Sequence, residues 1–307
     1  PRFANFPRCN HINDLNADIA IIGIDYKSAY NVSIPEEEES IFKHSQAPQE
    51  IRKHSLRYAK GLRNFDYDFG GDIFNGKNIK VVDIGDFSFS DSIQVDIERI
   101  AAVIKAILEK GVVPIVLGGD HGTPIPVLYG YSEHEPLCVV QIDAHLDYRD
   151  ERDGFKEGFS SGPRRAIELS WVDSLMQIGL RGIGSSTLAD DSAARKAGSI
   201  IITAEELHTK GVETVLNMLP RSENYYITID ADGLDPSLAP GVFFPSPGGL
   251  TYYETNNLLK GIARRGRICG VDITELIPRL DIQNLSSIFM ARIILNIIGA
   301  MAHSGQL

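Results

Sequence analysis

Short apolar, β-branched runs recur along the chain, and they constrain the fold more than any other feature. Each run has four to six residues with few polar interruptions. They lie at residues 19–24, 79–82, 112–117, 137–142, 175–178, 200–203, 225–229 and 268–273. Nearly continuous apolar character, instead of alternation, is typical of strands buried on both faces. The runs therefore predict a parallel sheet that helices cover.

Helical patterns separate several of these runs. Residues 92–110 carry apolar side chains at helical spacing, and Gly111 follows as a stop signal. Residues 251–264 and 282–301 are further predicted helices. This alternation predicts one α/β domain over residues 1–307, with a three-layer, doubly wound, mostly parallel sheet of about eight strands.

Acidic clusters follow three of the predicted strands. They read GGDHG at residues 118–122, DAHLD at 143–147 and DAD at 230–232. In open parallel sheets, ligands gather at the carboxyl ends of strands, so we expect these side chains to meet. Carboxylates packed this closely repel one another and resist desolvation unless cations neutralise them. The clusters therefore predict two bound divalent metal ions.

The types of ligand indicate which metals to expect. Carboxylates with one imidazole per ion favour a hard or borderline cation, with Mn²⁺ first and Ni²⁺ as the alternative. The clusters contain no cysteine, which argues against a structural zinc site. Two such ions lower the pKa of a bridging water and generate hydroxide near neutral pH.

Composition narrows the classes of partner. The chain has 41 acidic and 30 basic residues, a net charge of −11, which disfavours nucleic-acid binding and suits a small cationic substrate. We find no uninterrupted apolar run of the roughly 18–20 residues that span a bilayer. The first residues lack the apolar core of a secretory signal, so we expect a cytoplasmic enzyme without membrane contact. Cys9, Cys138 and Cys269 are expected to be free thiols.

These motifs resemble those of the ureohydrolase family, which comprises arginases, agmatinases and other guanidino-compound amidinohydrolases. The family motifs read Gly-Gly-Asp-His, Asp-Ala-His-x-Asp and Ser-x-Asp-x-Asp-x-x-Asp-Pro. The third corresponds here to TIDADGLDPSLAPG at residues 228–241, and it is followed by FPSPGGLTYYE at 244–254 and VDITELIP at 271–278. The resemblance runs from about residue 18 to the end and is strongest to agmatinase-like members.

The resemblance implies a role for each ligand position. His121, Asp143, Asp147 and Asp230 would bind one metal, and Asp143, His145, Asp230 and Asp232 the other, with Asp143 and Asp230 bridging. Asp147 would orient the bridging hydroxide, Glu275 would pair with the substrate guanidinium, and His145 completes the implied catalytic set. Hydroxide attack on the guanidinium carbon would release urea or a substituted urea and an amine. Family members commonly form trimers or hexamers.

The substrate-binding segments depart from the family pattern. Agmatinase-like relatives carry Ser-His-(Ala/Gly) before two arginines, whereas residues 159–165 read FSSGPRR, with Ser161 near that position. The first loop keeps the Pro-x-x-Ile-Arg core at residues 48–52 but lacks the usual glycines, and His44 is a candidate replacement imidazole. We therefore expect a non-arginine substrate: a substituted guanidine or biguanide, or agmatine or a guanidino acid.

Two alternatives compete with a guanidino hydrolase. The chain could be a metal-binding paralogous subunit that supports a catalytic partner chain in a hetero-oligomer. It could also be a deacetylase that uses one metal on a related fold. All six ligand positions are intact, and the second Asp-x-Asp pair is present, which favours a catalytic centre with two metals.

Overall fold

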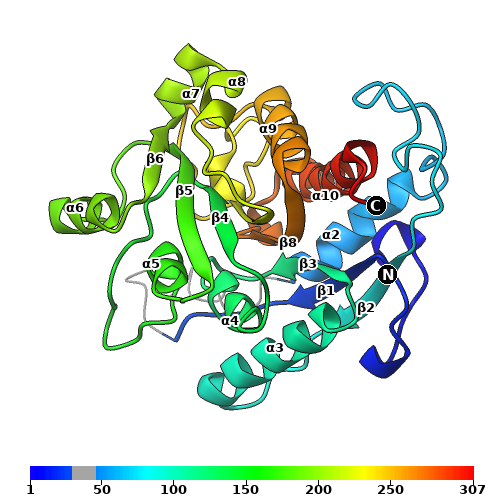
Figure 1. Cartoon of the computed structure of the whole chain (residues 1–307), viewed down its shortest axis with the longest axis horizontal. Coiled ribbons are helices and arrows are strands. Elements are labelled where there is room, and N and C mark those ends of the chain that lie inside the picture. Colours follow the sequence, from blue (N-terminus) through cyan, green and yellow to red (C-terminus); the bar gives the residue numbers. More distant parts are fainter. Residues whose placement is uncertain (30–45) are drawn as a thin grey trace.

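A single eight-stranded sheet forms the centre of the protein (Figure 1). The computed structural model describes residues 1–29 and 46–307. The strand order is β2-β1-β3-β8-β7-β4-β5-β6, and every pairing is parallel. The strands are β1 (Ile19–Ile24), β2 (Val81–Asp86), β3 (Val113–Gly118), β4 (Leu137–Ile142), β5 (Val172–Leu180), β6 (Ile200–Thr203), β7 (Asn224–Asp230) and β8 (Arg267–Thr274). The predicted α/β class and all eight predicted strands are confirmed.

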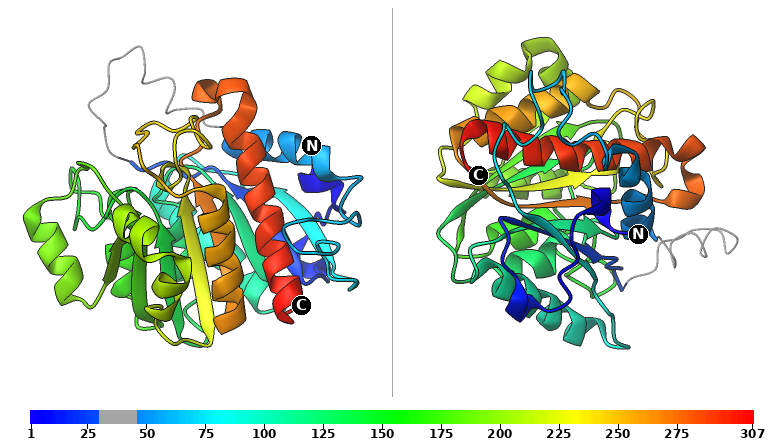
Figure 2. Two further views of the ribbon diagram at one scale, coloured as in Figure 1. Left: turned by 90° about the horizontal axis from the view of Figure 1, so that it is seen from above. Right: turned by 90° about the vertical axis from the view of Figure 1, so that its right-hand side faces the viewer.

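Helices cover both faces of this sheet (Figures 1 and 2). One face carries α2 (Ala47–Ser55), α7 (Ala204–Lys210), α8 (Val212–Asn217), α9 (Tyr252–Arg265) and α10 (Leu285–Ser304). The other face carries α3 (Ile93–Leu108), α4 (Pro124–Tyr129), α5 (Gly162–Ile167) and α6 (Leu188–Lys196). Short 3₁₀ turns lie at Phe3–Asn5, Ile12–Asp14, Leu56–Tyr58, Ala231–Gly233, Pro278–Leu280 and Ile282–Asn284.

The predicted boundaries are displaced where polar residues belong to a strand or helix. The second apolar run ends at residue 82, but β2 continues to Asp86 and buries alternate residues. It lies at one edge of the sheet, where strands accept polar side chains. The last helix begins three residues later than predicted, because Gln283 and Asn284 adopt left-handed backbone conformations. The Asp281 carboxylate accepts two N–H groups of its first turn, from Ser286 and Ser287.

Helix α10 is the principal core helix on its face of the sheet. By length and composition the stretch Ile282–Ser304 could cross a membrane, although 83% of its most apolar window is buried inside the protein. Its apolar side chains belong to the same buried cluster as those of α2 and α9. The long apolar stretch is therefore explained by packing against the sheet.

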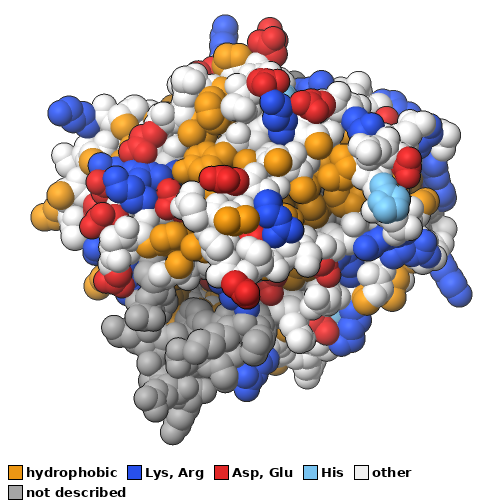
Figure 3. Space-filling model, turned by 90° about the horizontal axis from the view of Figure 1, so that it is seen from below, with side chains coloured by type: hydrophobic (Ala, Val, Ile, Leu, Met, Phe, Trp, Pro, Cys, Tyr) orange, Lys and Arg blue, Asp and Glu red, His pale blue; other side chains and the backbone are white. Residues whose placement is uncertain are grey.

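On the face of the molecule shown in Figure 3, acidic and basic side chains are interspersed with hydrophobic ones.

The Pro-x-x-Ile-Arg core of the sequence proves to be structural. Arg52, on α2, is 2% exposed, and its Nε donates to the Asp83 carboxylate at 2.8 Å. Its other nitrogens donate to Asp83, to Asp86 and to the Gly85 carbonyl. Asp83 also accepts the backbone N–H of Phe3 at 2.8 Å. This buried ion pair joins α2, β2 and the N-terminal segment.

We expect the substitution Arg52→Met to reduce the free energy of unfolding by about 3–5 kcal/mol, because it removes the buried counter-charge of Asp83 and leaves only the partly exposed Arg8 at 3.7 Å. Urea unfolding of metal-free protein measures the change. Arg195→Met is the matched control, since Arg195 pairs with Asp191 on the surface and should change stability by less than about 1 kcal/mol. Equal losses in the two variants would contradict this account of Arg52.

Candidate metal centre

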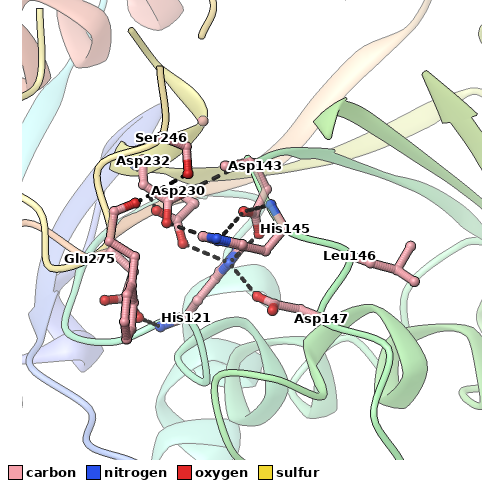
Figure 4. A network of polar contacts seen from close by, with 12 residues as sticks. His121, Asp143, His145, Leu146, Asp147, Asp230, Asp232, Ser246 and Glu275 are labelled. Atoms are coloured by element: carbon pink, nitrogen blue, oxygen red, sulfur yellow. Dashed lines mark hydrogen bonds and ion pairs between the residues drawn. The ribbon is translucent and has the colours of Figure 1, made fainter. Parts of the chain in front are cut away.

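The residues singled out from the sequence gather at the carboxyl ends of four neighbouring strands in the middle of the sheet (Figure 4). His121 lies three residues beyond β3, and Asp143 directly follows β4. Asp230 is the last residue of β7, and Glu275 directly follows β8. Because β3, β8, β7 and β4 are adjacent in that order, their ends bring these side chains together.

Two groups of candidate ligand atoms lie at this edge of the sheet. One contains His121, Asp143, Asp147 and Asp230, the other Asp143, His145 and Asp232, and the ligand atoms in each lie within 4.8 Å of one another. Asp143 is common to both groups. Asp230 falls only in the first, and one of its oxygens accepts the backbone N–H of Asp232 at 2.7 Å. Its expected role as a second bridge therefore stays a prediction.

The ring of His121 tests whether a cation fits. Its Nε2 lies 2.9 Å from the Thr228 hydroxyl, which donates its own proton to Asp272 at 2.7 Å. Thr228 must therefore accept, so Nε2 carries a proton. Nδ1 faces oxygens of Asp143, Asp230 and Asp147 at 2.9, 3.1 and 3.3 Å. Against the cost of burial, these carboxylates raise the pKa of His121 well above its usual value. A buried ring nitrogen that faces three carboxylates fits a shared cation, which would take the place of the proton on Nδ1.

Hydrogen bonds fix the orientation of the shared carboxylate. Asp143 accepts the side-chain amide of Gln141 at 2.5 Å and the backbone N–H of His145 at 2.6 Å. The Asp232 carboxylate lies 3.0 Å from Nδ1 of His145 and accepts the N–H of Ala144. The carboxylates of the second group are thus oriented before any ion arrives.

Burial and mutual repulsion disturb the protonation of the cluster. Burial and the neighbouring Asp232 and Asp143 charges raise the pKa of Asp230 well above its usual value. Burial and Asp143 likewise raise the pKa of Asp147 to about 7. Against the cost of burial, Asp143 and Asp232 raise the pKa of His145 to about 12. Without cations the cluster must hold protons instead, and metal binding would release them.

Glu275 lies beside the first ligand group, and hydrogen bonds fix both its backbone and its carboxylate. Its backbone N–H donates to the Gly119 carbonyl at 2.8 Å, and its Oε1 accepts the His121 N–H at 2.7 Å. On its other side, Gly119 lets the loop that follows β1 approach, since a Cβ at Gly119 would lie 2.1 Å from the Tyr26 carbonyl oxygen. Burial and the nearby Asp120 raise the pKa of Glu275 to about 8.

Two residues at the carboxyl edge of the sheet, beside the ligand groups, adopt left-handed backbone conformations. Asp147 has φ +46° and Glu275 has φ +63°, a region that non-glycine residues occupy at a cost. Strained residues of this kind concentrate at functional sites. The geometry therefore sets both side chains apart from ordinary strand-end acids.

The remaining expected substrate residues are placed less directly. Ser161 is buried at the start of α5, and its hydroxyl has no hydrogen-bond partner among the described residues. The neighbouring Gly162 packs near the His121 carbonyl. His44 lies outside the described residues. Substrate contact by Ser161 or His44 stays a prediction.

Sequence reasoning missed the supporting residues Gln141, Thr228 and Asp272. Each interrupts an otherwise apolar strand, and each is buried. A buried polar side chain almost always has a hydrogen-bond partner, so these interruptions were a usable signal. Their partners are the metal-ligand candidates themselves or, for Asp272, the Thr228 hydroxyl.

Comparison with known proteins identifies the family. The model of the arginase family matches residues 17–299. The chain belongs to the arginase family. It is 32% identical to a guanidinobutyrase from Pseudomonas aeruginosa over 254 residues, 80% of this chain and 77% of that protein. It is 29% identical to an agmatinase from Pyrococcus horikoshii, covering 83% and 84% of the two chains.

Solved structures agree with this membership. The proclavaminate amidino hydrolase from Streptomyces clavuligerus superposes with a TM-score of 0.84 at 25% identity, covering 99% of this chain and 97% of that one. The family resemblance, the fold and the enzyme class inferred from the sequence, a hydrolase of guanidino carbon–nitrogen bonds, are therefore confirmed. The similarity to the Pyrococcus horikoshii agmatinase is consistent with the agmatinase-like motifs in the sequence.

We expect the substitution Asp143→Ala to remove both metal ions, because Asp143 is the residue common to both ligand groups. Asp232→Ala should keep one ion, since it leaves the first group complete. Metal content per chain, measured by mass spectrometry after loading with Mn²⁺ and desalting, distinguishes the two, with circular dichroism confirming that each variant folds. Two ions per chain in the Asp143 variant would contradict the assignment.

Proposed function

We propose that this arginase-family chain is a hydrolase that uses two metal ions to cleave a guanidino compound other than arginine, releasing urea or a substituted urea together with an amine. The observation that carries the proposal is the position of His121 Nδ1, which is buried among three carboxylates. The ligand set favours Mn²⁺, with Ni²⁺ as the alternative. When bound, such a pair supplies a water made nucleophilic at neutral pH.

The chain's own residues would bind and orient the substrate. Glu275 is fixed through its backbone and through the His121 N–H, so its carboxylate can accept guanidinium N–H groups in a charge-assisted contact. That contact would hold the guanidinium carbon beside the ligand cluster. Asp147, on the same edge, would orient the attacking water and accept its proton.

The reaction balances with one water. Water adds to the guanidinium carbon, and the bond to one nitrogen breaks. Both protons of the water pass to that nitrogen, the first by way of Asp147, so it leaves as an ammonium ion while the carbon keeps the oxygen as urea or a substituted urea. His145 would complete the second ligand group through Nδ1, 3.0 Å from Asp232. This assignment gives Asp147, His145 and Glu275 distinct tasks.

The altered segments support a substrate other than arginine. Residues 159–165 lack the histidine of agmatinase-like relatives, and Ser161 near its position is buried. A substituted guanidine, a biguanide, agmatine or a guanidino acid remain the candidates, with Ser161 and His44 as residues that would shape the choice. The resemblance also supports a trimer or hexamer, assembled from this chain alone or with a paralogous chain.

A panel of guanidines tests the proposed function. Protein loaded with Mn²⁺ or Ni²⁺ is incubated with arginine, agmatine, guanidino acids, methylated guanidines and a biguanide, and released urea and amine are quantified. We expect turnover of at least one compound and the least turnover with arginine. Absence of turnover for every compound, with two ions bound per chain, would contradict the proposal.

Within the same assay, Glu275→Gln should lower kcat/KM by about 100-fold, because the neutral amide loses the charge-assisted contact with the guanidinium. The glutamine keeps an oxygen for the His121 N–H, so metal content should not change. Glu135→Gln, on an exposed turn, is the matched control. Unchanged kcat/KM in the Glu275 variant would remove Glu275 from the site.

A further inference from the structure

His145 lies on the most exposed side of the ligand cluster. Its side chain is 18% exposed, whereas those of the other five ligand candidates are at most 10% exposed. A substrate that approaches the cluster from solvent therefore passes beside His145. The residues that flank this ring form the mouth of the site.

A phenylalanine ring packs against His145 at this mouth. The Phe244 ring centroid lies 6.4 Å from that of His145, and the two ring planes meet at 82°. Phe243 packs against Phe244 edge-to-face, with the ring centroids 4.5 Å apart. Phe244 is nevertheless 48% exposed. It therefore leaves apolar surface open beside a metal-ligand candidate, where a bound substrate can cover it.

Hydrogen bonds fix the segment that carries Phe244. Arg181, which directly follows β5, donates through Nη2 to the carbonyl oxygens of Ser246 at 2.9 Å and Asp232 at 2.6 Å. Ser246 therefore lies beside Asp232, as Figure 4 shows. The Asp235 carboxylate accepts the N–H groups of two consecutive glycines at the end of the segment, at 3.2 and 3.3 Å. The position of Phe244 is thus tied to the backbone of the second ligand group.

The loop that follows β5 also flanks His145. A Cβ at Gly184 would lie 2.8 Å from Cδ2 of His145, so the backbone of this loop packs closely against the ring. The preceding residue, Ile183, is fully exposed. Two neighbours of His145 outside the ligand groups are therefore an aromatic ring and a glycine, and neither carries a charge.

A guanidinium held at Glu275 lies within reach of this mouth. Oε1 of Glu275 accepts the N–H of His121, which belongs to the first ligand group. The Nδ1 atoms of His121 and His145 lie 2.9 and 3.6 Å from the two oxygens of the same Asp143 carboxylate. A short alkyl chain therefore spans the distance from a guanidinium beside Glu275 to the ring beside His145.

We propose that Phe244 determines substrate specificity, so that the enzyme prefers guanidines with an apolar substituent, such as N-alkylguanidines, over guanidines of equal length that end in a charged group. The substituent would pack on Phe244 while Glu275 holds the guanidinium. Covering apolar surface stabilises the complex, whereas a charged end group would lose hydration against a ring that forms no ion pair with it. This inference rests on the proposed function and narrows its candidate substrates to the substituted guanidines.

Matched substrates test the proposal. The metal-loaded protein is assayed with guanidines that carry a four-methylene chain ending in a methyl, an ammonium or a carboxylate group. We expect kcat/KM for the methyl compound to exceed that for each charged compound by about tenfold. Equal or faster hydrolysis of either charged compound would overturn the proposal while leaving the proposed function intact.

Variants of Phe244 separate a role in specificity from a structural one. Phe244→Ala should reduce the preference for the methyl compound by about fivefold, mainly by raising its KM, because the apolar surface that the chain covers is lost. Phe244→Leu keeps most of that surface and should keep most of the preference. Equal losses of kcat/KM for all three compounds in both variants would show that Phe244 only supports His145, and would overturn the proposal.

Phe89→Ala is the matched control. Phe89 is 38% exposed and packs edge-to-face on Phe87 at 4.9 Å, in the loop that follows β2. Four strands separate β2 from β4, which carries His145 at its end. This variant should leave the preference unchanged, and an effect equal to that of Phe244→Ala would contradict the assignment.

If no compound were hydrolysed, the proposed function would fail. Calorimetric titration of the three compounds into the metal-loaded protein would then test the preference by binding alone. Tighter binding of the methyl compound, weakened in Phe244→Ala, would support the role of Phe244. Equal or tighter binding of a charged compound would overturn it.

Discussion

Repulsion among buried carboxylates is the constraint on which the rest of this structure depends. Asp143, Asp147, Asp230 and Asp232 are all buried, and their ligand atoms lie within a few ångströms of two imidazoles. Such a cluster destabilises a folded protein unless protons or cations neutralise it. Divalent cations do so while adding reactivity, which links the stability of this edge to its chemistry. The same electrostatic demand thus accounts for both the ligand set and the class of reaction.

The sheet supplies the geometry that this cluster requires. Four central strands end side by side, so residues separated by more than 150 positions meet without long loops. Buried polar residues then fix each ligand: Thr228 and Asp272 orient His121, and Gln141 holds Asp143. Away from the ligands, the buried pair between Arg52 of α2 and Asp83 of β2 anchors that strand and the N-terminal segment. Buried hydrogen bonds thus hold the ligand side chains in place, as a metal site requires.

Much of this architecture could be predicted from the sequence, for a physical reason. Strands buried on both faces need nearly continuous apolar runs, so the eight strands were visible, and the carboxyl-edge rule placed His121, Asp143 and Asp230 together. Polar interruptions were harder to interpret. Asp83 and Asp86 hid the true extent of β2, and Thr228 and Asp272 gave no sign of which residue they contact. Pairings across the sheet depend on strand order, which local patterns do not encode. Substrate contact by His44 and Ser161 stays a prediction, since His44 lies outside the described residues and no substrate is bound near Ser161.

The central claim is that two cations occupy the paired ligand groups around Asp143. Anomalous X-ray diffraction from crystals of the Mn²⁺-loaded protein, recorded at the manganese edge, tests this most directly. The account predicts two anomalous peaks, one within bonding distance of His121 Nδ1 and one within bonding distance of His145 Nδ1, with the Asp143 carboxylate between them. A single peak, or none, with His121 Nδ1 hydrogen-bonded directly to a carboxylate, would contradict it.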